Sequence, residues 1–163
     1  MNIRRILVGA TTLCLLGTLS GCGFFSGDKR DPDGRVTAST NIDAFSLQVG
    51  DCIITADLGD QFTEIPVVPC GEAHDAEVFH SFDMPDGDYD ADELKENGNR
   101  VCYGTVKEYV GPNYYKVTEL GLDVYYLGPT PSSWSNGDRT VTCIANAASG
   151  ESELTSSVKG MGN

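Results

Sequence analysis

Hydrophobic and polar residues alternate, or apolar residues form short runs between turns, at several places after residue 44, and this pattern predicts β-strands. The stretches are 45–49 with a continuation at 52–54, 66–70, 76–84, 122–127 and 140–145. Prolines bound the stretch at 66–70, which favours a place at a sheet edge. In the stretch at 76–84, Phe79 is the exception to an alternation that puts five residues on one face: Ala76, Val78, His80, Phe82 and Met84.

Between Asp92 and Val110 the apolar residues change to a helical spacing. Five residues share the expected buried face: Leu94, Val101, Cys102, Thr105 and Tyr109. Asp92 and Glu93 suit the positive N-terminal end of a helix, and Gly111-Pro112 ends it. We therefore expect an α+β domain, in which one helix packs on a small, largely antiparallel sheet of four or five strands.

The N-terminus predicts export and lipidation. Arg4 and Arg5 precede an uncharged run from residue 6 to residue 19, which is shorter than the roughly 20 residues that a membrane-spanning helix needs. The run ends in Leu19-Ser20-Gly21-Cys22, which resembles a bacterial lipobox. In a lipobox the cysteine thiol is lipidated and the peptide is cut before it. An uncleaved anchor, or an ordinary signal in which Cys22 is incidental, is the alternative.

This pattern divides the chain into three parts. We expect a lipoprotein signal peptide at 1–21, the lipidated Cys22 with a flexible polar tether at 22–43, and a folded domain at 44–163. The domain would then lie at the extracytoplasmic face of the cell membrane and be held there by lipid.

The charge of the chain excludes one class of partner. The sequence has 24 acidic residues and 11 Lys or Arg, a net charge of −13, and removal of residues 1–21 leaves −15. Nucleic acid is therefore not an expected partner, because a phosphate backbone requires a basic surface. Docking on anionic lipid through a basic patch is excluded for the same reason.

Four cysteines remain once Cys14 leaves with the signal and Cys22 takes the lipid: Cys52, Cys70, Cys102 and Cys143. An even number in an exported domain predicts disulfides, and four cysteines allow three pairings. We favour Cys52–Cys70 with Cys102–Cys143, because each pair joins elements that can be neighbours. The rival is a zinc site built from Cys70, His74 and further cysteines, although no C-x-x-C pair occurs.

Few residues suggest catalysis. The chain has two histidines and no G-x-S-x-G motif. His80 is expected in or near the core, whereas His74 and Asp75 lie in a loop where an exposed imidazole can bind a partner, or shape its own turn. The acidic segment 83–93 does not fit an EF-hand loop, so we favour a solvated loop that starts the helix, and loose Ca²⁺ binding is the alternative. No catalytic residue, metal ligand or cofactor is assigned.

An ordered set of motifs resembles the septum formation family, extracytoplasmic domains of actinobacterial lipoproteins and single-span proteins. The set spans about 110 residues: Val49-Gly50-Asp51-Cys52; Val68-Pro69-Cys70 with His74-Asp75-Ala76-Glu77-Val78; Cys102 on a helix ending Tyr109-Val110-Gly111; Pro131, Trp134, Gly137-Asp138-Arg139 and Cys143; and Leu154-Thr155 with Ser157-Val158-Lys159-Gly160. Ala73 and Ser156 depart from the family pattern, which affects only local loop shape.

The resemblance implies a role near cell division and no established enzymatic activity. The candidate binding surface consists of His74, Asp75, Trp134, Asp138 and Arg139, with a purely structural role for the last three as the alternative. The leading hypothesis is a non-enzymatic lipoprotein that binds a cell-envelope or division protein. A carboxylate-based envelope hydrolase and a weak divalent-cation-binding surface protein are the alternatives.

Overall fold

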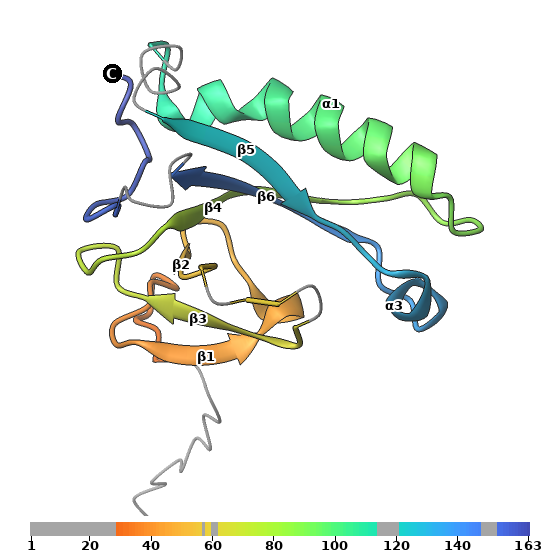
Figure 1. Cartoon of the computed structure of the whole chain (residues 1–163), viewed down its shortest axis with the longest axis horizontal. Coiled ribbons are helices and arrows are strands. Elements are labelled where there is room, and N and C mark those ends of the chain that lie inside the picture. Colours follow the sequence, from red (N-terminus) through yellow and green to blue (C-terminus); the bar gives the residue numbers. More distant parts are fainter. Residues whose placement is uncertain (1–28, 57, 60–61, 114–120, 148–152) are drawn as a thin grey trace, which may run out of the picture.

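A computed structural model describes residues 29–56, 58–59, 62–113, 121–147 and 153–163, and the predicted signal peptide and Cys22 lie outside these ranges. The described residues form one antiparallel six-stranded sheet in the order β1-β3-β2-β4-β6-β5 (Figure 1). The elements are β1 (Thr40–Asp43), the 3₁₀ turn η1 (Ala44–Ser46), β2 (Cys52–Ile53), β3 (Glu64–Val68), β4 (Ala76–Asp83), α1 (Ala91–Val110), β5 (Leu122–Leu127), α3 (Pro131–Ser135) and β6 (Thr140–Ala147). The expected α+β class, with one main helix on the sheet, is confirmed.

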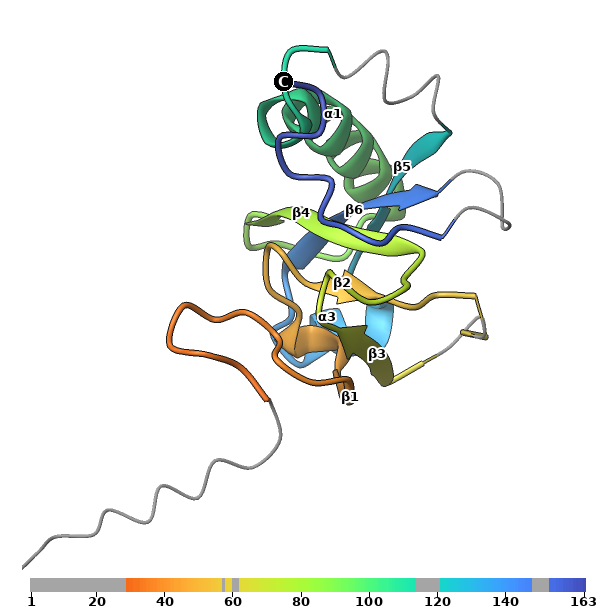
Figure 2. The same cartoon turned by 90° about the vertical axis from the view of Figure 1, so that its left-hand side faces the viewer.

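The helix and the N-terminal strands lie at opposite ends of the molecule (Figures 1 and 2). One apolar cluster fills the space between α1 and the strands β4, β6 and β5, and includes Phe79, Val106 and Val158. A second cluster lies on the other face of the sheet, around Ile53 and Ile144. None of the described helices has the length and apolar character that crossing a membrane requires.

The folded domain begins earlier than expected. We predicted a flexible tether at 22–43, but residues 40–43 form β1 and pair with β3, and Arg30 bridges Val36 in a hairpin. Two buried groups explain this difference: Ile42 is 4% exposed, and the carboxylate of Asp51, 2% exposed, forms a salt bridge with Arg30. Pairing of β1 also adds a sixth strand to the four or five that were expected.

In this region one expected strand is absent, and another strand, expected at 66–70 and found as β3, has a different place in the sheet. Residues 45–49 form η1 and a loop, because the side chain of Asp43 accepts a hydrogen bond from the Phe45 amide and turns the chain. The stretch at 66–70 is not at the edge of the sheet, since β3 lies between β1 and β2. Pro66 has no amide hydrogen to donate, and it is tolerated because it lies beside the end of β2, which is only two residues long. There the carbonyl of Pro66 accepts a hydrogen bond from the Ile54 amide at 3.1 Å.

A β-bulge explains the irregular pattern of β4. Val78 pairs with Ile144 and His80 with Cys143, so Phe79 is the extra residue. Ala76 and Val78 therefore pack in the cluster around Ile144, whereas Phe79 and Phe82 pack in the cluster beneath α1. The single face expected for residues 76–84 is thus divided between the two sides of the sheet.

The predicted helix is confirmed at Ala91–Val110. The Asp90 carboxylate caps its N-terminus, and Gly111, with φ of 114°, follows its last turn. Five buried residues follow each other at four-residue spacing: Leu94, Gly98, Cys102, Val106 and Val110. Gly98 allows close packing on β5, because a Cβ at this position would lie 2.8 Å from the ring of Tyr126.

Both favoured disulfides are confirmed. Cys52 bonds Cys70, with a sequence separation of 18, and Cys102 on α1 bonds Cys143 on β6, with a separation of 41. Closing these loops lowers the entropy of the unfolded chain, which stabilises the fold by about 3 and about 4 kcal/mol in the chain-entropy model.

Candidate functional site

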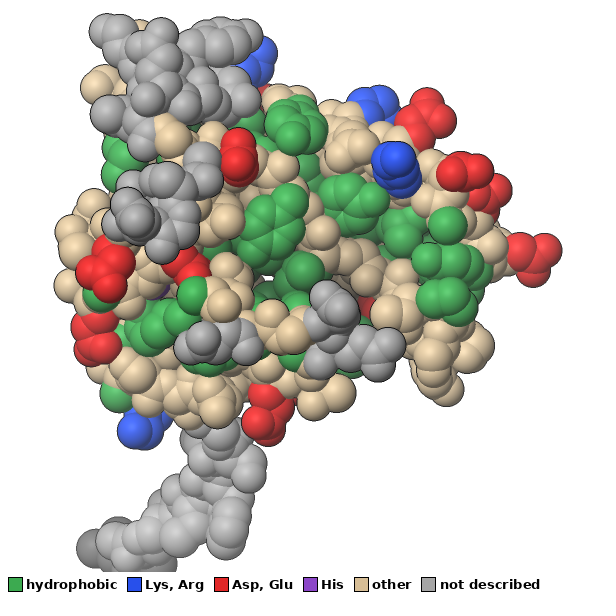
Figure 3. Space-filling model, in the orientation of Figure 1, with side chains coloured by type: hydrophobic (Ala, Val, Ile, Leu, Met, Phe, Trp, Pro, Cys, Tyr) green, Lys and Arg blue, Asp and Glu red, His purple; other side chains and the backbone are tan. Residues whose placement is uncertain are grey.

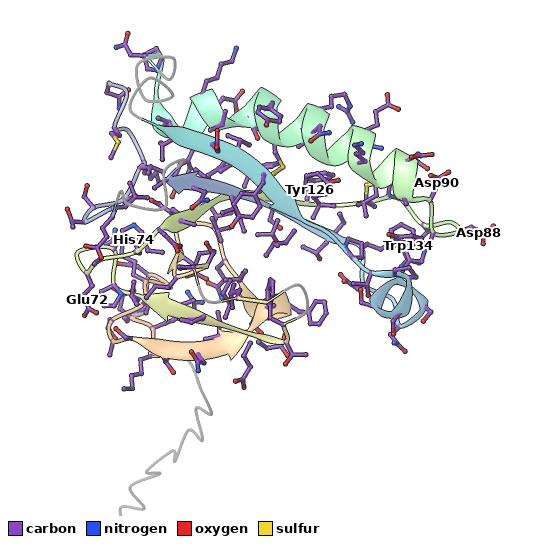
Figure 4. All side chains as sticks on the ribbon, viewed as in Figure 1. Glu72, His74, Asp88, Asp90, Tyr126 and Trp134 are labelled. Atoms are coloured by element: carbon purple, nitrogen blue, oxygen red, sulfur yellow. A yellow bond between two sulfur atoms is a disulfide. The ribbon has the colours of Figure 1, made fainter. Side chains whose placement is uncertain are left out.

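The structure separates the five candidate binding residues into two groups at opposite ends of β4. His74 and Asp75 come directly before this strand, whereas Trp134, Asp138 and Arg139 lie beside the loop that follows it (Figure 4). The eight residues of β4 separate the groups by about 25 Å. The two groups therefore cannot form one site.

Trp134 holds the acidic loop against the sheet. It lies in α3, a five-residue helix with Pro131 at its start and a capping box between Thr130 and Ser133. The indole N–H donates a hydrogen bond to the carbonyl of Gly87 at 2.9 Å, and the Tyr89 ring makes a T-shaped contact with the indole, with centroids 5.7 Å apart. The acidic loop and Trp134 thus converge as one structural unit.

Arg139 is fixed on the face of Trp134. Its guanidinium carbon lies 3.9 Å from the centroid of the indole ring, a cation–π contact. The Nη1 group donates to the carbonyls of Trp134 and Asp138, both at 2.8 Å. The Nε atom lies 3.5 Å from Oδ1 of Asp86, whose side chain is fully exposed. Backbone carbonyls thus hold Nη1, whereas Nε is buried and, among the described residues, has no hydrogen-bond acceptor and only the solvated carboxylate of Asp86 nearby.

An open depression of about 450 Å³ surrounds this arginine. Its lining combines one guanidinium with three carboxylates: Arg139 with Asp83, Asp86 and Asp138. Acidic side chains also gather nearby, over the start of α1 and the loop before it (Figure 3). The depression therefore presents both signs of charge to solvent.

The acidic segment has local structural partners. Asp83 accepts a hydrogen bond from the Thr140 hydroxyl, Asp138 accepts one from the Thr140 amide, and Asp90 accepts two from the first turn of α1. In the part of the chain that the structure describes, no three acidic side chains here come within metal-ligand distance of one another. These contacts favour the loop that starts the helix over the Ca²⁺ alternative.

His74 is buried, with 2% of its surface exposed, which corrects the expectation of an exposed loop histidine. Its Nδ1 lies 2.8 Å from the carbonyl of Glu72, so Nδ1 carries the proton, because a carbonyl only accepts. Its backbone exchanges two hydrogen bonds with Leu154. Nε2 has no hydrogen-bond partner among the described residues. His74 therefore shapes its own turn and joins that turn to the C-terminal segment.

Asp75 has a similar structural role. Its carboxylate accepts hydrogen bonds from the amides of Thr55 and Ala56 at 2.7 to 2.9 Å and from the Thr55 hydroxyl. Burial, with a smaller contribution from the Asp75 charge, raises the pKa of Tyr125 to about 12. Neither His74 nor Asp75 adds to the depression around Arg139.

Glu77 is a buried polar residue that the strand pattern does not single out. None of its surface is exposed, and it lies on β4 beneath α1. Oε1 accepts hydrogen bonds from the hydroxyls of Tyr109 and Ser157, both at 2.7 Å, and Oε2 accepts one from the amide of Val158 at 2.6 Å. Burial and the adjacent Glu77 raise the pKa of Tyr109 well above its usual value. A lone acidic residue within an apolar strand is the only sequence signal for this network.

The disulfide between Cys52 and Cys70 lies beside this carboxylate. Both sulfurs and a Glu77 oxygen are within 4.8 Å of one another. The sulfurs are bonded to each other, so this group is not a set of free metal ligands. Among the described residues, no metal-ligand cluster contains both Cys70 and His74, as the rival zinc hypothesis required.

Comparison with known proteins places the chain in a family. The family model described as septum formation matches residues 11–156, which is most of the chain. No curated protein and no solved structure matches this chain. The match includes all four disulfide cysteines, the buried Glu77 and the Trp134–Arg139 pair. This chain belongs to the septum formation family.

Proposed function

We propose that this chain is a lipid-anchored, extracytoplasmic and non-enzymatic domain that binds a protein of the cell envelope or the division apparatus. Membership of the septum formation family supports a role related to division. The lipobox-like Leu19-Ser20-Gly21-Cys22 supports the anchor, with Cys22 as the lipidated residue. The family is not a known enzyme family, which supports a binding role.

The observation that carries the binding role is the fixed guanidinium of Arg139. Stacking on Trp134 and two backbone carbonyls hold the group in place, so binding a partner costs little side-chain entropy. Arginine over an aromatic ring in a preformed depression is typical of the residues that dominate interface energies. A partner carboxylate that displaces the exposed Asp86 would supply the acceptor that the buried Nε of Arg139 lacks among the described residues.

The neighbouring acids define the partner further. Asp83 and Asp138 accept hydrogen bonds through Oδ1 and line the same depression as Arg139. A partner segment with an acidic residue next to a basic one would match both signs of charge. Such complementarity mainly sets specificity and the rate of association.

The experiment compares Arg139→Gln with Arg100→Gln in cells that carry the full-length chain. Arg100 is a matched control, because it is an exposed arginine on α1 that also makes a side-chain hydrogen bond, to Asn97. We expect Arg139→Gln to lose in-cell crosslinking to a division or envelope protein and to alter septum spacing. Arg100→Gln should retain both, and thermal melting should show that both variants fold.

Two results would refute the binding role. One is a folded Arg139→Gln variant that crosslinks and divides like the wild type. The other is unchanged septation after deletion of the gene. Mass spectrometry of Cys22, together with release of the Cys22→Ala variant from membranes, tests the anchor separately.

A further inference from the structure

Two adjacent segments form a surface at the start of the described chain. The first is the hairpin at 29–37, closed by the Arg30–Val36 bridge and by the hydrogen bond from the Thr37 amide to the Lys29 carbonyl. The second is the loop at 44–50, which touches the hairpin where a Cβ on Gly34 would lie 3.3 Å from the Gln48 side chain. We call these two segments the N-terminal surface. The hairpin lies away from α1 (Figures 1 and 2), whereas the loop ends at Gly50, where a Cβ would lie 3.8 Å from the Tyr109 hydroxyl of α1.

The N-terminal surface exposes apolar side chains. Phe45 is 68% exposed and Val49 is 52% exposed, and both lie in the loop at 44–50. The described residues contain two other exposed large hydrophobic side chains, Tyr103 on α1 at 55% and Met161 near the C-terminus at 41%. Phe45 and Val49 thus place two solvent-exposed apolar side chains in one short loop, and an exposed phenyl ring is a side chain that can enter a lipid interface.

The charge of the N-terminal surface differs from that of the remaining chain. The hairpin contains three basic and two acidic residues, and the loop contains no charged residue. Arg30 also neutralises the buried Asp51. The mature chain has a net charge of −15, but this surface is not acidic and can therefore approach an anionic bilayer without strong repulsion.

The length of the tether decides which surface faces the membrane. From Cys22 to Lys29 the chain advances seven residues, which span at most about 25 Å when fully extended. A domain of this size is about 35 Å across. The tether is shorter than the domain, so the surface next to Lys29 remains nearest to the lipid attached at Cys22.

We propose that the N-terminal surface lies on the bilayer and that Phe45 inserts its ring into the lipid interface. This inference rests on the proposed lipid anchor at Cys22. The occupant of the surface is the same membrane that holds the lipid, because the short tether keeps that membrane within reach. An aromatic ring at a bilayer interface, with basic residues such as Lys29 and Arg35 in the neighbouring hairpin, is the usual arrangement of interfacial anchors.

The test measures depth in the membrane by tryptophan fluorescence. Phe45→Trp and the control Tyr103→Trp are made in the full-length chain, lipidated in cells and reconstituted in vesicles of phosphatidylcholine and phosphatidylglycerol. Bromine atoms on the lipid chains quench nearby indoles, and the wild-type signal of Trp134 is subtracted. We expect the added emission of Phe45→Trp to fall roughly two-fold, because an interfacial side chain lies about 5–10 Å into the headgroup boundary. Tyr103→Trp should keep its intensity.

Equal quenching of the two variants, or stronger quenching of Tyr103→Trp, would overturn the proposed orientation. The mass of Cys22 in each sample separates this failure from failure of the anchor. If Cys22 carries no lipid, the signal-free chain is coupled through its thiol to a maleimide phospholipid, and the depth measurement is repeated. Quenching of Phe45→Trp in the coupled chain would support the surface even though the natural anchor had failed.

Discussion

Replacement of Glu77 by leucine should destabilise the protein although it removes a charge from the core. The change leaves three hydrogen-bond donors without an acceptor: the hydroxyls of Tyr109 and Ser157 and the amide of Val158. Val158 is fully buried, so water cannot replace the lost acceptor for its amide. An unsatisfied buried donor costs about 1–3 kcal/mol, and each of the two partly buried hydroxyls adds about 0.5–1.5 kcal/mol. We expect a loss of about 3 kcal/mol in the free energy of unfolding.

The assay is urea unfolding of Glu77→Leu beside Glu64→Leu. Glu64 is an exposed residue of β3, so the control makes the same chemical change on a strand without removing a buried acceptor. The control should remain within about 0.5 kcal/mol of the wild type. Hydrogen exchange at the Val158 amide should accelerate in Glu77→Leu and not in the control.

A Glu77→Leu variant as stable as the control would refute this reasoning. That result would mean that the desolvation cost of the carboxylate cancels its three hydrogen bonds. Tyr109→Phe removes one donor and leaves the charge in place, and therefore isolates one of the three interactions. Its expected cost is about 1.5 kcal/mol, because the Ser157 hydroxyl and the Val158 amide still donate to the carboxylate.

Two further predictions concern packing and alkaline pH. Gly98→Ala should lower the unfolding free energy by about 1–3 kcal/mol, because the new Cβ would lie 2.8 Å from the Tyr126 ring. Gly104→Ala, on the same helix with nothing within 4 Å of its Cβ, should raise it by up to about 1 kcal/mol, and equal thermal shifts for the two would contradict the packing argument. The pKa values of Tyr109 and Tyr125 in the folded state lie above the ordinary 10.0, so folding favours the neutral phenols. The stability that the neutral phenols contribute is therefore complete below pH 10 and is lost as the pH rises through the folded-state pKa values. Urea unfolding with absorbance at 295 nm should show stability falling above pH 10, less steeply in Tyr109→Phe, and equal slopes would argue against a raised pKa for Tyr109.

Local patterns in the sequence predicted local structure well. The helix at 91–110 follows from apolar spacing and from Gly111 at its end, both of which operate within a few turns. The disulfides followed because Cys102 lies on the buried face of that helix and Cys143 lies on an apolar strand. The bulge at Phe79 is visible in the sequence, because the adjacent apolar residues Val78 and Phe79 interrupt the alternation of apolar and polar positions.

Contacts between distant segments could not be predicted in the same way. Glu77 looks like a polar strand position, because its partners lie 32, 80 and 81 residues further along the chain. The polar composition of residues 29–43 suggested a tether, but pairing with β3 and the buried Asp51 draw this segment onto the domain. His74 seemed exposed because a loop next to a cysteine is usually at the surface, yet the C-terminal segment at Leu154 covers it.

The hydrogen bonds of Glu77 also determine when the fold can close. A chain that emerges from the ribosome or a translocation pore in order presents β4 and α1 long before Ser157 and Val158. Until those residues arrive, the carboxylate lacks two of its three donors, so its burial beneath α1 is incomplete. Cys52 and Cys70 have emerged by then, and their sulfurs lie next to the same open site. The growing chain should therefore keep this disulfide next to an incompletely closed core until residue 158 has emerged and donates to Glu77.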